Sequence, residues 1–255
     1  MTEPIIYSRN YLDSQTVIGG AGNWANQEKL FDGNSETQFT SIDADDDDVD
    51  VALYIQFYEG GVLQDRYIDT LIFLNHNILE FTSFYWNGTG YSELVDDDDI
   101  SDEDSFFSFT GVTTREVLIV LKKTQTVDQE KLIGELFLCE KTDFSKEMVS
   151  YTIGSRTKAV ETLLADGTLH RSIIRDAGNK SEKYESKVVF DYLTQAEIDD
   201  LIALKESGEN FLWQPESISR PELVYNVQWC GVLRYGYSNI YKGAGFRIEM
   251  DLREI

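Results

Sequence analysis

The sequence concentrates hard oxygen ligands in two runs of aspartate, and Ca²⁺ is an ion that takes several such ligands. The first run, residues 43–48 (DADDDD), matches the opening of an EF-hand calcium loop. That loop needs glycine at its sixth position and glutamate at its twelfth, where this chain has Asp48 and Tyr54, so an EF-hand is excluded. This run and the second one, residues 96–99, are predicted to be solvated, mutually repelling loops between strands.

Residue patterns for nucleophilic, zinc-dependent or phosphate chemistry are missing from the sequence. No serine lies in a GxSxG turn, and His76 and His170 have no motif neighbours. Cys139 and Cys230 form no CxxC pair, so a zinc site is excluded, and two buried free thiols are favoured over a disulfide. The glycine-rich residues 19–22 lack the GK[ST] of a phosphate-binding loop. Carboxylate pairs carry no information among 46 acidic residues, so we predict a non-enzymatic protein.

The charge of the chain restricts its partners. The formal net charge is −24, and residues 1–142 contain 8 Lys and Arg against 28 Asp and Glu, a net charge of −20. A field of this sign repels phosphate backbones and anionic lipids, so neither sequence-specific nucleic acid nor a membrane is expected as a partner. No apolar stretch approaches the roughly 20 residues that span a bilayer, and residues 1–10 do not form the apolar region of a signal peptide. We therefore expect synthesis in the cytoplasm.

The elements that would position any site are mainly strands. Short apolar runs separated by Gly, Asn and Asp predict a β-sandwich in the first part of the chain. The expected strands are residues 51–57, 67–74, 81–86, 116–121 and 132–138. The acidic bias ends around residues 141–146, which predicts two domains, residues 1–142 and residues 143–255.

The second domain is predicted to contain one helix. Thr194 is the expected N-cap, Glu197 completes a capping box, and Gly208 ends the helix. The apolar face of this helix consists of Ile198, Leu201, Ile202 and Leu204. A hairpin over residues 222–237 and 240–255 follows, and the last strand alternates apolar and charged side chains. The predicted fold class is mainly β, with a jelly-roll β-sandwich followed by a tail-tube-like β-sandwich or split barrel with one flanking helix.

Two segments of the first domain resemble a known family. Residues 29–41 (KLFDGNSETQFTS) and 133–138 (IGELFL) are similar to the galactose-binding-like, discoidin-type β-sandwich. Residues 67–74 and 84–88 match strands of that family in order, and the resemblance covers about residues 5–140. It implies a jelly-roll β-sandwich for this part of the chain.

This resemblance implies a calcium site and a sugar site. Members of the family often hold a structural Ca²⁺ ion, and the matching positions here are Asp32, Asn34, Thr37 and Glu135. The alternative is a simple turn at residues 32–33 with Glu135 exposed. Many members also stack a sugar ring on an exposed aromatic side chain. Trp24, Tyr91 and Phe106, in expected loops, are the candidates for that role, and burial or a protein interface is their alternative.

The second domain, from about residue 167 to residue 254, is similar to the minor tail protein M of lambda-like phages and to the ring domain of distal tail proteins. The capped helix, residues 208–215 (GENFLWQP), residues 224–229 (VYNVQW) and residues 245–252 (GFRIEMDL) carry the resemblance. It implies a structural virion protein that forms a ring at the distal tail tube or tail tip. The expected partners are copies of itself and the neighbouring tail tube, hub or tape-measure proteins, with the first domain at the periphery for protein or glycan contact. The alternative is a carbohydrate-binding module that attaches to a host-surface glycan.

Overall fold

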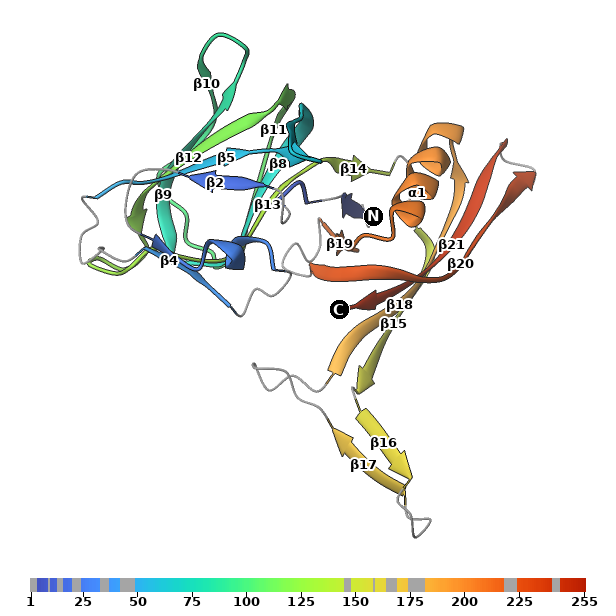
Figure 1. Cartoon of the computed structure of the whole chain (residues 1–255). Coiled ribbons are helices and arrows are strands. Elements are labelled where there is room, and N and C mark those ends of the chain that lie inside the picture. The colour runs from blue at the N-terminus through green and yellow to red at the C-terminus, as the bar shows by residue number, and fades with distance from the viewer. Residues whose placement is uncertain are drawn as a thin grey trace. The chain divides into compact units, whose positions relative to one another are not determined.

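The chain forms two compact units in the computed structural model, one of residues 10–141 and the other of residues 1–9 with 142–255. The residues described are 4–8, 10–12, 16–19, 24–32, 37–41, 49–144, 148–157, 159–163, 169–173, 182–217, 224–239 and 244–255. Strands dominate both units (Figure 1), and α1 is the single α-helix of the described residues. The predicted mainly β class is therefore confirmed.

Residues 10–141 form a β-sandwich of two five-stranded antiparallel sheets. The first sheet has the order β10 (Tyr91–Asp97), β9 (Ile78–Trp86), β12 (Glu116–Thr124), β5 (Val51–Gln56) and β2 (Val17–Gly19). The second has the order β11 (Ser105–Thr114), β8 (Arg66–His76), β13 (Leu132–Cys139), β4 (Phe39–Ser41) and β3 (Trp24–Ala25). A hairpin of β6 (Tyr58–Glu59) and β7 (Val62–Leu63) and the 3₁₀ helix η1 (Gln27–Leu30) complete this unit.

Alternation along the strands separates the core of the sandwich from its solvent face. On β5, Leu53 and Ile55 are buried, whereas Tyr54 and Gln56 point to the opposite side and are half-exposed. β12 repeats the pattern, and β8 and β13 contribute further core residues from the other sheet. All five strands predicted for this part are present, because their apolar residues meet in one core.

One prediction for this unit is wrong in part. Asp96 and Asp97 belong to β10 and not to a loop between strands. Asp96 faces solvent beside β9, where its carboxylate accepts a hydrogen bond from the Thr82 hydroxyl at 2.6 Å and lies 3.5 Å from Lys122 Nζ. An edge strand tolerates this charge because one of its faces is wet. The first acidic run, residues 43–48, lies outside the described residues.

The second unit is built on a seven-stranded sheet. Its order is β14 (Lys141–Asp143), β1 (Ile5–Tyr7), β19 (Phe211–Gln214), β20 (Tyr225–Asn239), β21 (Ala244–Glu254), β18 (Glu182–Leu193) and β15 (Met148–Thr157). A hairpin of β16 (Ala159–Leu163) and β17 (Leu169–Ile173) extends from the ends of β15 and β18 (Figure 1). The helix α1 (Gln195–Ser207) packs on the sheet through Ile198 and Leu201.

The predicted helix and final hairpin of this unit are confirmed. Thr194 accepts from the Glu197 amide, the Glu197 carboxylate accepts from the Thr194 amide, and Gly208 ends the helix with φ 67°. In β21, Ile248, Met250 and Leu252 are fully buried, as their alternation with charged residues predicted. Both the capping pattern and the period of two are local features, which a sequence displays directly.

The first residues of the chain depart from the predicted domain division. β1 pairs antiparallel with β19, with Ile6 opposite Trp213, so residues 1–9 belong with the second unit. The Tyr7 hydroxyl donates to Gln214 Oε1 at 2.9 Å and fixes this pairing in a buried environment. Tyr7 and Gln214 are 207 residues apart in the chain. No local pattern in residues 5–7 indicates a partner strand at that distance.

Cys139 and Cys230 are both free thiols, as predicted, although only Cys139 is buried. None of the helices that the structure describes is long and apolar enough to cross a membrane.

Candidate functional site

The residues predicted to bind calcium are placed only in part. The Asp32 carboxylate accepts from the Thr37 hydroxyl at 2.8 Å and from Lys29 Nζ at 3.1 Å, and Asn34 lies outside the described residues. Glu135 is buried on β13, so the alternative of an exposed Glu135 is wrong. The described part of the chain contains no group of three or more His, Cys, Asp or Glu residues that could hold a metal, and the Ca²⁺ site stays a prediction.

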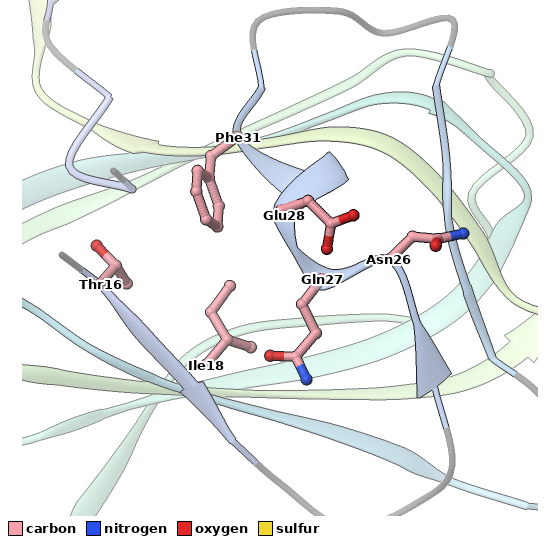
Figure 2. Close-up of a pocket in the computed structure, with 6 residues that line it drawn as sticks. All are labelled: Thr16, Ile18, Asn26, Gln27, Glu28 and Phe31. Carbon is pink, nitrogen blue, oxygen red and sulfur yellow. The ribbon is translucent and has the colours of Figure 1, made fainter. Parts of the chain in front are cut away.

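A small pocket lies between η1 and the segment that contains β2. Its volume is about 320 Å³, and Figure 2 shows Gln27, Glu28 and Phe31 on one side and Thr16 and Ile18 on the other. In the orientation that satisfies its neighbours, the Gln27 amide donates to the Ile18 carbonyl and accepts from Trp24 Nε1. The Phe31 ring packs against the core of the sandwich. The Gln27 amide and the Phe31 ring, which line the pocket, are therefore engaged in contacts within the protein.

The outer face of the first sheet carries a better-formed site. The cross-strand register pairs Tyr91 of β10 with Trp86 of β9, and Glu116 of β12 with Gln56 of β5, while the β12–β9 ladder ends next to them at Val117 opposite Tyr85. Tyr54 lies two residues further along β5, opposite Leu118. These strands are hydrogen-bonded side by side, so a rigid sheet positions all five side chains on one face.

The Tyr91 ring contacts the rings of both Trp86 and Tyr54, and we call Tyr54, Trp86 and Tyr91 the aromatic cluster. The Trp86 and Tyr91 ring centroids are 5.5 Å apart at 71°, and those of Tyr54 and Tyr91 are 6.2 Å apart at 73°. β10 and β5 are separated by two strands, so the two tyrosines reach toward each other across β9 and β12. Edge-to-face contacts of this kind are favourable and hold the rings in place. Tyr91 keeps 39% of its surface exposed, so the cluster is open to a ligand.

Hydrogen bonds to Glu116 fix the polar part of the site. Glu116 Oε2 accepts from the Tyr54 hydroxyl at 2.6 Å and from the Tyr91 hydroxyl at 3.3 Å, and Oε1 accepts from Gln56 Nε2 at 3.1 Å. The hydrogen bond to Glu116 raises the pKa of Tyr54. Burial of the hydroxyl end, together with the neighbouring Tyr54 and Glu116, raises the pKa of Tyr91. Both phenols therefore stay protonated and act as donors to the carboxylate at neutral pH.

The turn between β9 and β10 borders the cluster. Asn87 Oδ1 accepts from the amides of Thr89 and Gly90, both at 3.0 Å, and Asn87 Nδ2 donates to Ser92 Oγ at 2.7 Å. An asparagine that binds the backbone of its own turn in this way sets the turn geometry. The turn thus fixes the ends of the strands that carry Trp86 and Tyr91.

Sequence reasoning found one residue of this site and missed the others. Of the proposed stacking residues, Tyr91 lies in the cluster, whereas Trp24 and Phe106 lie half-buried elsewhere, and all three are on strands instead of loops. Tyr54, Trp86 and Glu116 were missed because their proximity depends on strand pairing. The available signal was an outward-facing polar or aromatic residue at alternate positions of β5, β9 and β12.

The histidines lie outside the cluster. His76 is buried, its Nδ1 accepts from the Ile78 amide at 3.0 Å, and its Nε2 lies 3.0 Å from Ser105 Oγ. Burial lowers its pKa to about 4, so the ring is neutral at pH 7. His170 pairs with Thr162 in the hairpin of β16 and β17. His76 therefore uses both ring nitrogens within the fold.

Comparisons with known proteins add the following findings. No protein-family description matches the chain, and no curated protein matches its sequence. Similar solved structures include the family 32 carbohydrate-binding module of Clostridium perfringens NanJ in complex with galactose, with 12% identity over 54% of this chain and 99% of that one, at a TM-score of 0.43. CpGH89CBM32-6, produced by Clostridium perfringens, has 14% identity over 52% of this chain and 99% of that one, at 0.42.

A third similar structure is CBM32-3 from a family 31 glycoside hydrolase of Clostridium perfringens. It has 12% identity over 52% of this chain and 95% of that one, at a TM-score of 0.42. Likenesses at this identity and with TM-scores below 0.5 assign no function to the chain by themselves.

Proposed function

We propose that residues 10–141 form a carbohydrate-binding module and that the aromatic cluster is its binding site. The observation that supports this function is the contact of Tyr91 with both Trp86 and Tyr54, beside a carboxylate that the two tyrosines hydrogen-bond, on the solvent face of a rigid sheet. A sugar ring has an apolar C–H face and polar edges. Tyr91 and Trp86 can cover the apolar face, while Glu116 accepts from hydroxyl groups and Gln56 can exchange hydrogen bonds with them.

Removal of the Trp86 ring should test this site most directly. Trp86→Ala is expected to weaken the best-bound oligosaccharide from a glycan array by at least about tenfold, which corresponds to about 1.4 kcal/mol. The physical reason is the loss of apolar area that the sugar would otherwise remove from water. Isothermal titration calorimetry with the full chain and its Trp86→Ala variant measures the change.

Tyr67→Ala is the control for Trp86→Ala, because Tyr67 is an aromatic residue of the other sheet with 43% of its surface exposed. It should leave the affinity unchanged. Binding that survives Trp86→Ala, or that Tyr67→Ala weakens equally, would place the sugar site elsewhere. Phe31→Ala then tests the pocket of Figure 2 as that other place.

A second candidate function concerns the seven-stranded sheet, where we propose self-association as the tail-ring component that the sequence suggested. β15 ends the sheet, and only Tyr225–Val227 of β20 pair with β19. The rest of β20 has β21 as its single strand partner in the described part of the sheet. Apolar side chains line this free edge, with Val232 71%, Tyr235 52% and Tyr237 61% exposed. An exposed apolar edge is a template for pairing with another strand, and copies of the same chain would supply one.

A charge on the free edge of β20 should prevent such pairing. Tyr235→Lys is expected to convert an oligomer into a monomer, measured by size-exclusion chromatography with light scattering. Val62→Lys places the same charge at a site in the sandwich that is 60% exposed and should leave the oligomer intact. A wild-type chain that is monomeric at high concentration would argue against this second function without affecting the first.

A further inference from the structure

Glu116 is a carboxylate without a cationic partner among the described residues. Its contacts are the hydroxyls of Tyr54 and Tyr91 and the amide of Gln56. The lysines further along the same strand are used elsewhere, since Lys122 lies 3.1 Å from Glu80 and Lys123 lies 2.6 Å from it. The two lysine ammonium groups of this strand therefore lie beside Glu80 and not beside Glu116.

The hydrogen bonds leave part of the acceptor capacity free. A carboxylate has about four acceptor positions, and three are filled here, so Oε1 retains one. The hydroxyls of Tyr54 and Tyr91 also interact with each other, so the acceptor position that stays free is the one on Glu116 Oε1. The site therefore offers a charged oxygen acceptor to an N–H donor.

The rings of the aromatic cluster and the negative net charge of residues 10–141 also favour a cation beside Glu116. The faces of Trp and Tyr attract an ammonium group within about 6 Å. Tyr54 and Tyr91 both contact the Glu116 carboxylate, and the Trp86 ring lies against Tyr91. Residues 10–141 contain 7 Lys and Arg against 27 Asp and Glu, a net charge of −20, and this field concentrates cations near the surface. The same field repels sugars that carry carboxylate, sulfate or phosphate groups.

We infer that the aromatic cluster selects carbohydrates that carry a protonated amino group, with the ammonium seated between Glu116 and the rings of Trp86 and Tyr91. This inference rests on the proposed carbohydrate-binding function and names its ligand class. The ammonium donates to Glu116 Oε1, while the sugar ring covers the indole. Acidic glycans are excluded from the site by charge, and neutral glycans bind through stacking and hydroxyl hydrogen bonds without the ion pair.

Three β-1,4-linked hexasaccharides that differ only at C2 test the inference: those of glucosamine, N-acetylglucosamine and glucose. Calorimetry with the full chain is done at a pH at which the glucosamine amine is protonated, in low salt and in about 0.15 M salt. The glucosamine hexamer should bind at least about tenfold more tightly than the other two. Glu116→Gln should reduce this preference to less than threefold, because it removes the charge while the glutamine oxygen still accepts from the tyrosines.

Glu130→Gln is the control for the general field, because it removes the same charge from an exposed position outside the cluster. Equal loss of preference in Glu130→Gln and Glu116→Gln would overturn the inference, and so would equal wild-type binding of all three hexamers. Neutral binding that Trp86→Ala weakens would then leave the carbohydrate-binding function standing. If none of the three binds, the inference fails, and the glycan array decides separately whether the carbohydrate-binding function stands. The wild-type series decides the question even if Glu116→Gln does not fold.

Discussion

Gly245→Ala is expected to destabilise the seven-stranded sheet by about 2–3 kcal/mol, the cost of forcing atoms into a packed site. A Cβ atom at this position would lie 2.5 Å from the Cα and 2.7 Å from the carbonyl carbon of Tyr192. Tyr192 has φ 64° and lies where the pairing of β18 with β21 shifts register between Phe190 and Leu193. The bulge brings main chain over main chain, so no side-chain rotation can relieve the overlap. Hydrogen exchange of β21 amides, compared with the wild type, measures the loss.

Gly236→Ala is the control for this variant. It lies on β20 opposite Arg247, and a Cβ there meets no atom within 4 Å. Its hydrogen exchange should match the wild type or be slightly slower, since alanine restricts the unfolded chain more than glycine does. Equal protection of β21 in both variants would show that the bulge at Tyr192 yields easily.

Acidification from pH 6.5 to pH 4 is expected to remove about 3 kcal/mol of stability from the sandwich through His76 alone. Burial lowers the pKa of His76 to about 4 in the folded chain, from about 6.5 when the chain is unfolded. Below pH 6.5 the unfolded chain therefore binds a proton that the folded chain does not, which favours unfolding. The contribution is complete above pH 6.5 and lost as the pH falls toward the folded value. Urea unfolding of β8 and β9, followed by hydrogen exchange at several pH values, measures this slope.

His76→Asn separates this effect from the titration of the many carboxylates, which both chains share. The asparagine oxygen can still accept from the Ile78 amide, although the contact with Ser105 is lost. The variant should be less stable at pH 7 but should lose less stability on acidification. A pH dependence identical to that of the wild type would mean that His76 takes up a proton while folded.

The sequence predictions were correct for features that neighbouring residues in the chain determine, and they missed features that depend on residues far apart in the chain. The helix at residues 195–207 and the alternation in β21 are local, so both were predicted correctly. The pairing of β1 with β19 and the convergence of Tyr54 and Tyr91 depend on which strands become neighbours. A single sequence does not reveal that choice, because many pairings satisfy the same alternation of apolar and polar residues. Asp96 was predicted to lie in a loop because a charged side chain is unfavourable in a buried strand. The sequence does not show that Thr82 and Lys122 lie beside it.

The place of β1 in the sheet has a consequence for synthesis on the ribosome. Its partner Phe211–Gln214 emerges only after the whole sandwich has been translated, so the first strand must wait while an entire unit forms between it and its neighbour. Sandwich strands find their partners within residues 10–141 and can fold as a unit in the meantime. β1 therefore has no β19 partner until residues 211–214 have emerged, and chains released before that point would expose an unmatched strand to their neighbours.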